Sequence, residues 1–316
     1  MALHHLLALK KSTKPKGTFE GSGETLHLLA WRDHLVHVAV VGGRSYDETA
    51  TLEVTLLTPD LATVATTALP ETRRFHVKLL GDDLLIFAAR KTKDDRALVV
   101  VSLTKSTEAP KVIAFPAGED PVALDDTGHI YTRDEDALVV FAPPRDGANE
   151  LARLPIAWDK GEKGFRDLAI GGSRLLILGP RDYTGLKLID IANPRSPQLL
   201  HSFGGKFNAP DRLVRVGTET YLAYGVGDKA HVFRIEGDKL VSGGTVGVGD
   251  RYQRAVVEGD SALLFGGYKK GERGVVVRAG AKPEKVGTVT FADSLVSVVL
   301  TDAGALLATS DGVSAV

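Results

Sequence analysis

The strongest constraint on the fold is a repeated pattern of short strands and turns. From Phe165 to Phe203, the apolar runs FRDLAI, RLLIL, LKLIDI and QLLHSF are separated by GGS, GPRDYTG and ANPRSP. Each run has the length of a strand and is bounded by Gly, Pro, Asn, Asp or Ser, the residues that favour turns. The sequence therefore predicts a four-stranded antiparallel sheet over this segment.

The same pattern recurs along the chain, with first strands beginning near residues 26, 75, 122, 165, 213, 252 and 295. The period is roughly 45 residues, the length of one four-stranded propeller blade. The seventh repeat stops after two strands and a fragment, whereas residues 1–21 contain a strand, a Lys/Pro turn and a second strand. We therefore predict an all-β, seven-bladed β-propeller that forms a single domain over residues 1–316. Residues 1–21 are expected to complete the last blade, which removes two free sheet edges.

Composition excludes several classes of protein. The 39 basic and 40 acidic residues give a net charge of −1, so neither a nucleic acid nor a membrane surface is expected as a partner. Without cysteine there is no disulfide framework, zinc finger or thiol nucleophile, and no apolar run is long enough to span a membrane. The lysines of the N-terminus follow its apolar stretch, so no signal peptide is predicted. We expect a cytoplasmic protein, or a periplasmic or extracellular one if residue 1 follows a removed signal peptide.

One repeat has a more specific motif. In LKLIDIANPRSPQLL, residues 186–200, a strand ending in Asp-Ile precedes an Asn-Pro-x-x-Pro turn. Asn193 can begin the turn and the two prolines fix φ before the next strand. This blade resembles the LVIVD repeat of bacterial propeller proteins, and the match is strong in this blade only. The resemblance implies a bacterial propeller and no particular activity.

Motifs for catalysis or cofactor binding are weak. The segment from Gly225 to Ala230 has the spacing of a dinucleotide fingerprint, but a strand follows it where a phosphate site needs a helix. It is interpreted as a glycine-containing hairpin loop. The nine histidines form no metal-binding motif, and the acidic pairs at 82–83, 125–126 and 258/260 fall at first turns, where Asp bonds its own backbone. No cofactor and no metal are expected, although ligands gathered from separate blades stay an open alternative for a metal.

Candidate binding residues lie where the chain enters each first strand and in the loops between second and third strands. Alignment of the repeats on the first turn places His27, His76, Asp167 and Arg254 at equivalent positions. Trp158, Asp182, Lys206 and Phe207 lie in nearby loops. Arg, Tyr and Trp are enriched where proteins bind partners. The candidate residues are Arg74, His76, Arg166, Asp167, Arg181, Tyr183, Arg212, Tyr252 and Arg254. The alternative interpretation is that they join neighbouring blades through salt bridges and hydrogen bonds.

Two functions are compatible with this pattern. The first is a non-catalytic, monomeric propeller that serves as an interaction platform and scaffold for another protein. The second is a small-molecule or anion site in the axial channel, for binding or for lactonase-like hydrolysis. In that site His76 or His27 would act as base, and Arg74 or Arg254 would hold an anion. The first function is favoured, and no catalytic residue is assigned.

Overall fold

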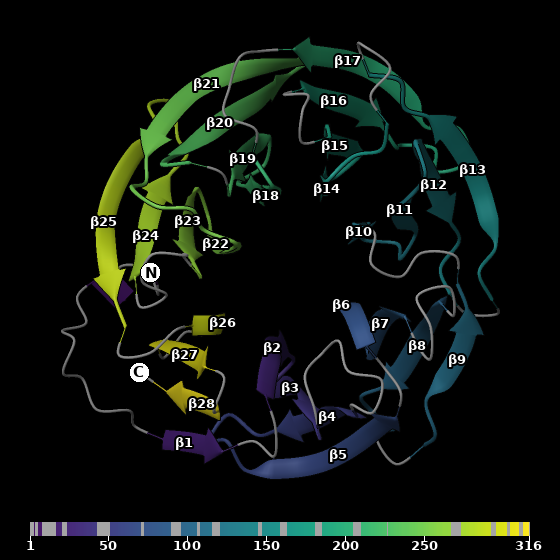
Figure 1. Cartoon of the computed structure of the whole chain (residues 1–316), viewed down its shortest axis with the longest axis vertical. Coiled ribbons are helices and arrows are strands. Elements are labelled where there is room, and N and C mark those ends of the chain that lie inside the picture. Colours follow the sequence, from purple (N-terminus) through teal and green to yellow (C-terminus); the bar gives the residue numbers. More distant parts are fainter. Residues whose placement is uncertain are drawn as a thin grey trace. The chain divides into compact units, whose positions relative to one another are not determined.

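The structure is a computed structural model. It describes residues 3, 6–7, 17–20, 24–42, 51–70, 73–89, 96–105, 108–115, 121–144, 147–158, 163–180, 185–204, 210–225, 227–266, 273–291, 295–301, 304–309 and 312–315. Within these ranges the chain contains 28 strands (Figure 1). It forms two compact units. Unit 1 contains Met1 and Asp120–Thr290, and unit 2 contains Ala2–Glu119 and Phe291–Val316.

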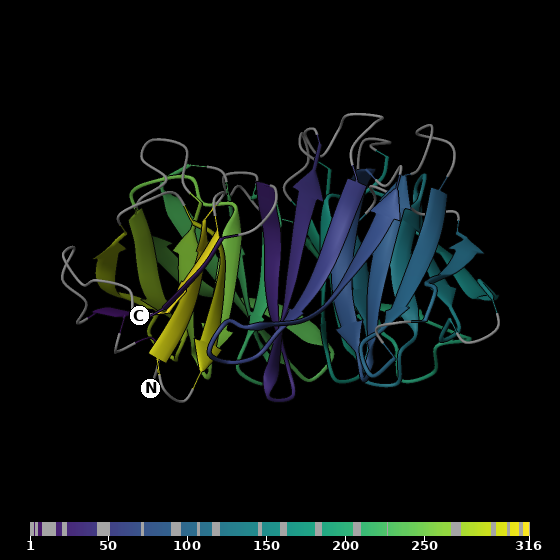
Figure 2. The same cartoon turned by 90° about the horizontal axis from the view of Figure 1, so that it is seen from below.

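Unit 2 contains three four-stranded antiparallel sheets. Blade 1 consists of β2 (Glu24–Trp31), β3 (His34–Val41), β4 (Thr51–Leu57) and β5 (Thr63–Pro70). Blade 2 consists of β6 (Arg73–Leu80), β7 (Asp83–Ala89), β8 (Arg96–Ser102) and β9 (Lys111–Ala114). Blade 7 has the order β1-β28-β27-β26, from β1 (Gly17–Glu20), β26 (Leu295–Thr301), β27 (Gly304–Thr309) and β28 (Gly312–Ala315). Figure 2 shows blades 1 and 2, in purple and blue, with strands side by side and connections at both ends.

Unit 1 contains the other four sheets. Blade 3 consists of β10 (Val122–Leu124), β11 (Ile130–Asp134), β12 (Ala137–Phe141) and β13 (Glu150–Pro155). Blade 4 consists of β14 (Asp167–Gly171), β15 (Arg174–Leu178), β16 (Gly185–Asp190) and β17 (Gln198–Gly204). Blade 5 consists of β18 (Arg212–Val216), β19 (Thr220–Tyr224), β20 (Lys229–Glu236) and β21 (Lys239–Gly247). Blade 6 consists of β22 (Arg254–Glu258), β23 (Ser261–Phe265), β24 (Arg273–Arg278) and β25 (Glu284–Thr290).

Seven four-stranded antiparallel blades confirm the predicted fold class, a seven-bladed β-propeller. Within unit 1 the first strands of successive blades, called the inner strands here, are neighbours: β10 with β14, β14 with β18 and β18 with β22. Second and third strands are nearly all buried, whereas outer strands such as β17 expose residues along their length. A strand buried on both faces needs a continuous apolar run, and this explains the repeats of Leu, Ile and Val.

The last blade contains residues from both ends of the chain. β1 pairs with β28 in register from Gly17 opposite Ala315 to Glu20 opposite Gly312. The expected division of two strands from each end is wrong, because three strands come from the C-terminal segment and one from the N-terminal segment. The expected fragment is the complete strand β28.

The prediction of a strand before the Lys/Pro turn is also wrong for the residues that the structure describes there. Leu3, Leu6 and Leu7 are helical, and Leu3 and Leu6 are buried. The spacing of these leucines, i, i+3 and i+4, places their side chains on one face of a helix. Burial of that face explains why a helical turn forms here and a strand does not.

Neighbouring blades pack face to face, and their contact requires small residues at some positions. Between blades 4 and 5, Leu176, Tyr221 and Phe233 belong to one buried cluster. At Gly171 an added Cβ would lie 2.5 Å from the Tyr221 hydroxyl oxygen and 2.8 Å from Nε of Arg215. Any larger residue here would displace the side chains of Tyr221 and Arg215 on the neighbouring blade.

Candidate functional site

The predicted equivalence of the inner-strand positions agrees with the registers of the first hairpins. The final pairs of these hairpins are Trp31 with His34, Leu80 with Asp83, Gly171 with Arg174, Val216 with Thr220, and Glu258 with Ser261. Four residues before the end of each inner strand lie His27, His76, Asp167, Arg212 and Arg254. These five residues therefore occupy equivalent positions, each on the first strand of its own blade.

Two candidates, Arg74 and His76, lie on β6 of unit 2. The register of β6 shifts between Arg73 and Phe75, so Arg74 occupies a β-bulge, and His76 is half-buried. The first strands β2 and β26 also have register shifts near their starts, between Thr25 and His27 and between Leu295 and Ser297. Arg181, Asp182, Tyr183, Lys206 and Phe207 lie outside the described residues.

Arg166 and Asp167 join blades 4 and 5. The Arg166 guanidinium donates from Nη1 to Asp211 at 2.7 Å and from Nε to the Gly179 carbonyl at 2.9 Å. Asp167 Oδ2 accepts the backbone N–H of Leu213 at 2.8 Å. These contacts fit the alternative interpretation of the sequence, in which inner-strand polar residues hold blades together.

Trp158 is also structural. Its side chain is buried, its indole N–H donates to the Gly164 carbonyl at 2.7 Å, and Nζ of Lys187 lies 5.0 Å from the ring centroid. Lys187 is itself buried, and its ammonium donates to the Ser202 hydroxyl at 2.9 Å. A cation over an indole ring, shielded from water, is a favourable contact. The sequence analysis placed Trp158 among the loop residues near the candidate site, whereas its side chain is buried in the cluster that joins blades 3 and 4.

Arg212 and Arg254 form the cationic part of the site. They are the first residues of β18 and β22, where Arg212 is exposed and Arg254 is half-buried. Burial lowers the pKa of Arg254, and the positive charge of Arg212 lowers it further. Tyr224 of β19 lies directly opposite Arg212 and is buried. Burial raises the pKa of the Tyr224 hydroxyl and the negative charge of Asp167 raises it further, whereas the charges of Arg212 and Arg254 oppose the shift. The four groups therefore interact electrostatically within one cluster.

Gly225 packs closely against residues that precede β18 and β22. Gly225 has φ of +113°, and an added Cβ would lie 3.1 Å from Asp211 Cβ and 3.4 Å from the Tyr252 carbonyl oxygen. The Arg251 guanidinium donates to the Gly225 carbonyl at 3.4 Å. β20 follows this loop directly, so the predicted glycine hairpin is confirmed and the nucleotide fingerprint is a chance match.

Basic side chains gather at this end of unit 1. β18, β20, β22 and β24 all begin here, because alternate strands of an antiparallel sheet run in the same direction. The basic end of blades 5 and 6 is defined as Arg212, Lys229, Arg251, Arg254 and Arg273. All but Arg254 are exposed. Of the acidic residues here, Asp211 and Asp250 are half-buried and Asp228 is exposed, and Asp211 is paired with Arg166. Among the described residues at this end, four exposed cationic side chains outnumber the one exposed carboxylate, so the charge that they present is mainly positive.

Tyr252 lies within the basic end. It is buried, which raises the pKa of its hydroxyl, and Asp250 raises it further while Arg273 opposes the shift. The ring belongs to the buried cluster that joins blades 5 and 6. Tyr252 therefore contributes to the packing beneath the exposed arginines.

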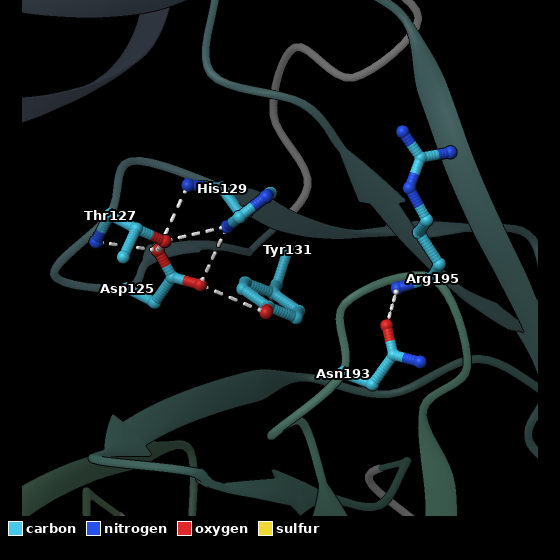
Figure 3. A network of polar contacts seen from close by, with 6 residues as sticks. All are labelled: Asp125, Thr127, His129, Tyr131, Asn193 and Arg195. Carbon is cyan, nitrogen blue, oxygen red and sulfur yellow. Dashed lines mark hydrogen bonds and ion pairs between the residues drawn. The ribbon is translucent and has the colours of Figure 1, made fainter.

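A second polar cluster surrounds Asp125 in the first turn of blade 3 (Figure 3). Oδ1 accepts the backbone N–H groups of Thr127 and His129, each at 2.9 Å, and the Thr127 hydroxyl at 2.7 Å. Oδ2 lies 3.1 Å from the Tyr131 hydroxyl, which donates to it, and 3.1 Å from Nδ1 of His129. Burial acts to raise the pKa of Asp125, but the hydrogen bonds from Thr127, His129 and Tyr131 together leave it lowered. The predicted role of this acidic pair in a turn is therefore observed at Asp125, whereas no motif predicted the contacts of Asp125 with His129 and Tyr131.

The geometry around His129 differs from that of a nucleophilic triad. Thr127 Oγ1 lies 2.7 Å from Nδ1 of His129, the same ring nitrogen that Asp125 contacts. In Ser-His-Asp chemistry the hydroxyl and the carboxylate contact opposite ring nitrogens. The cluster is suited to locking the turn. Among the described residues there is also no group of three His, Cys, Asp or Glu side chains that could hold a metal.

The Asn-Pro-x-x-Pro turn of blade 4 has the predicted geometry. Asn193 Oδ1 accepts the backbone N–H of Arg195 at 3.1 Å (Figure 3). The backbone carbonyl of Asn193 accepts the N–H of Ser196 at 2.9 Å. Asn193 therefore begins the turn that leads into β17, by the side-chain bond typical of Asn in turns.

Comparison with known proteins supports the fold and assigns no family. No family profile matches the chain, and no curated protein matches it. Among solved structures, 611 chains match, so the likeness extends over many proteins and selects no function. One of these is PorZ of Porphyromonas gingivalis, described as an essential bacterial surface component of the type-IX secretion system.

The match to PorZ has a TM-score of 0.58 at 13% identity and covers 94% of this chain and 37% of the PorZ chain. This chain therefore spans little more than a third of that protein, and at this identity the likeness shows the fold alone. In the part of the chain that the structure describes, no helix is both long and apolar enough to cross a membrane.

Proposed function

We propose that this protein is a non-catalytic β-propeller that acts as a protein-interaction platform, with its docking surface at the basic end of blades 5 and 6. The observation that carries the proposal is the exposure of four cationic side chains, Arg212, Lys229, Arg251 and Arg273, at the same end of two adjacent blades. Arginine is enriched among the residues that contribute most to binding between proteins. The partner is therefore expected to present an acidic surface.

The frame beneath this surface is well suited to preorganised binding. Arg166 and Asp167 link blade 4 to blade 5, and the close approach at Gly225 links blade 5 to blade 6. A backbone that is held by packed strands loses little conformational freedom on binding, which favours affinity. Exposed charges around such a surface mainly raise the association rate and make it dependent on salt.

The repeat in blade 4 supports a bacterial origin. We infer from its Asn-Pro-x-x-Pro turn that the chain is a distant relative of the LVIVD-repeat propellers. PorZ, which shares the fold, is a component of a secretion system. Membership of PorZ in a secretion system supports the proposal that this chain also acts within an assembly, and its partner is to be found by experiment.

The test is cross-linking in cells that produce the protein, with quantitative mass spectrometry of captured proteins. Wild type is compared with Lys229→Glu/Arg251→Glu/Arg273→Glu. The control variant, Arg195→Glu/Lys282→Glu/Lys285→Glu, makes the same charge change at exposed positions on the opposite end of the same unit.

We expect a protein that wild type and control capture equally and that the basic-end variant loses. The purified partner should then bind more weakly as salt is raised. Equal capture by all three proteins, or equal loss from both variants, would refute this docking surface.

A further inference from the structure

The hydrogen bonds around Asp125 fix which nitrogen of the His129 ring carries the hydrogen. Nδ1 of His129 lies 3.1 Å from Oδ2 of Asp125 and 2.7 Å from Oγ1 of Thr127. The Thr127 hydroxyl donates its hydrogen to Oδ1 of Asp125 at 2.7 Å, so towards the ring its oxygen acts as an acceptor. Both neighbours of Nδ1 are therefore acceptors. A neutral imidazole has one N–H and one lone-pair nitrogen, so the hydrogen is on Nδ1 and the lone pair is on Nε2.

The carboxylate that selects this tautomer is held firmly in place. Oδ1 of Asp125 accepts the backbone N–H groups of Thr127 and His129, each at 2.9 Å, and Oδ2 accepts the Tyr131 hydroxyl at 3.1 Å. Burial raises the pKa of Asp125, but the hydrogen bonds from Thr127, His129 and Tyr131 outweigh burial and leave the pKa lowered. Asp125 is therefore ionised at neutral pH and keeps accepting from Nδ1.

The lone-pair edge of the His129 ring faces solvent. The side chain is 19% exposed, and Figure 3 shows its second ring nitrogen on the side away from Asp125. Within the described part of the chain, Nε2 of His129 makes no hydrogen bond and is not one of the buried polar atoms that lack a partner. An imidazole that donates its N–H to a carboxylate and presents its lone pair to solvent is a nucleophile.

Two other histidines show what is particular to this arrangement. His201 accepts the backbone N–H of Leu240 at Nδ1, at 3.2 Å, so its neutral ring carries the hydrogen on Nε2. His34 contacts Asp33 through Nδ1 at 2.7 Å, but that carboxylate is 82% exposed and water competes for it. Among these three rings, only that of His129 is held by a carboxylate that is itself mostly buried.

We propose that Nε2 of His129 is a modification site that accepts a phosphoryl group from a small phosphodonor of the acyl phosphate class. The Nε2 lone pair forms a bond to phosphorus while the bond from phosphorus to the acyl oxygen breaks, and the carboxylate leaves with that electron pair. Nδ1 keeps its hydrogen, so the ring becomes cationic and the Asp125 carboxylate balances its charge. No proton has to be removed, and water solvates the phosphoryl oxygens at this exposed edge.

The site is separate from the proposed docking surface. The turn that contains Asp125 and His129 follows the first strand of blade 3, whereas the basic end of blades 5 and 6 lies where their first strands begin. An acyl group on an imidazole hydrolyses quickly in water, whereas a phosphoryl group persists for longer. The phosphoryl group is therefore the class of modification that an exposed imidazole can retain.

The test is incubation of the full chain with acetyl phosphate at about pH 8, where an imidazole is neutral, followed by mass spectrometry that locates the phosphoryl groups. The modified protein is also checked for the acid lability and alkali stability of phosphohistidine. Wild type is compared with His129→Gln, Asp125→Asn and the controls His34→Gln and His201→Gln. In parallel, nitrogen NMR of the labelled histidines reports which ring nitrogen carries the hydrogen.

We expect His129 to be phosphorylated in wild type and in both controls, and faster than His34 or His201. Asp125→Asn should react roughly 10- to 100-fold more slowly, because an amide N–H facing Nδ1 moves the ring hydrogen to Nε2. The spectra should place the lone pair of His129 on Nε2 in wild type and on Nδ1 in Asp125→Asn. Should Asp125→Asn fail to fold, the wild-type spectrum and the rates of the three histidines decide the question.

Four results would overturn the proposal. They are the absence of a phosphoryl group on His129, equal rates at His129, His34 and His201 in wild type, an N–H on Nε2 of wild-type His129, and an unchanged rate in folded Asp125→Asn.

Discussion

The stability of unit 2 should fall in mild acid because of His37. This side chain lies on β3 and is only 1% exposed, with its ring packed edge-on against Phe19 of β1 at a centroid distance of 5.1 Å. Burial lowers the pKa of His37 from 6.5 to about 4, and the negative charge of Glu53 opposes the shift only in part. The buried imidazole is therefore neutral in the folded protein at neutral pH.

The sign of the effect follows from comparing the two states. In the unfolded chain the histidine takes up a proton near pH 6.5, whereas in the folded protein it does so only near pH 4. The unfolded state thus binds more protons between these values, and the free energy of unfolding decreases as pH falls from about 6.5 to about 4. A shift of roughly 2.5 pH units corresponds to about 3 kcal/mol, at about 1.4 kcal/mol for each unit.

The assay is urea unfolding, followed by tryptophan fluorescence, at several pH values between 7.5 and 4.5. Wild type is compared with His37→Leu, which fills the buried site without a titratable group. We expect the variant to lose about 2.5 kcal/mol less than wild type over this range, because the full effect is reached only below pH 4. Parallel curves for the two proteins would refute the assignment of this acid sensitivity to His37. His231→Gln is a useful comparison, since burial and then Lys229 also lower the pKa of His231.

Three further predictions concern packing and closure. Gly171→Ala should destabilise the protein by about 1–3 kcal/mol in urea unfolding, because its Cβ would overlap the next blade, whereas Gly247→Ala, with no atom within 4 Å of its Cβ, should change stability little. Asp125→Ala should cost about 1–3 kcal/mol, since a buried tyrosine hydroxyl and two backbone N–H groups lose their acceptor, against about 0.5 kcal/mol for the exposed Asp126→Ala. A similar loss in both aspartate variants would contradict this. Deletion of residues 1–21 removes β1 and exposes the edge of β28, so light scattering should show aggregation and the melting temperature should fall. A monomeric truncated protein with the parent melting temperature would disprove closure by β1.

Much of the fold could be predicted from local sequence. A strand that is buried on both faces must be a continuous apolar run, and a turn between such strands must contain Gly, Asn, Asp or Pro. Both signals lie within a few residues of one another, as in RLLIL of β15 and in the turn begun by Asn193. The weaker signal at the chain ends led to the wrong division of blade 7, because β28 has only four residues and the leucines near the N-terminus follow a helical spacing.

The candidate site could likewise be predicted only in part. The alignment of repeats was sufficient to place Asp167 and Arg254 at equivalent positions, because each lies at a fixed distance from its own turn. It could not show that Asp167 bonds to Leu213 of the next blade while Arg254 lies beside another cation. Those contacts depend on which side chains face each other across a blade interface, and no local pattern encodes that.

By itself, the sequence determined the number of blades, the strand order of blades 1 to 6 and the turns between their strands, since these are set by contacts between residues close together in the chain. Only the tertiary structure decided which polar groups became structural. It buried Trp158 against Lys187, used Asp125 to lock a turn with His129, and left Arg212 exposed next to the half-buried Arg254. The physical reason is that the energy of a charge or a hydrogen-bonding group depends on its burial and its partners, and both are fixed by residues distant in sequence.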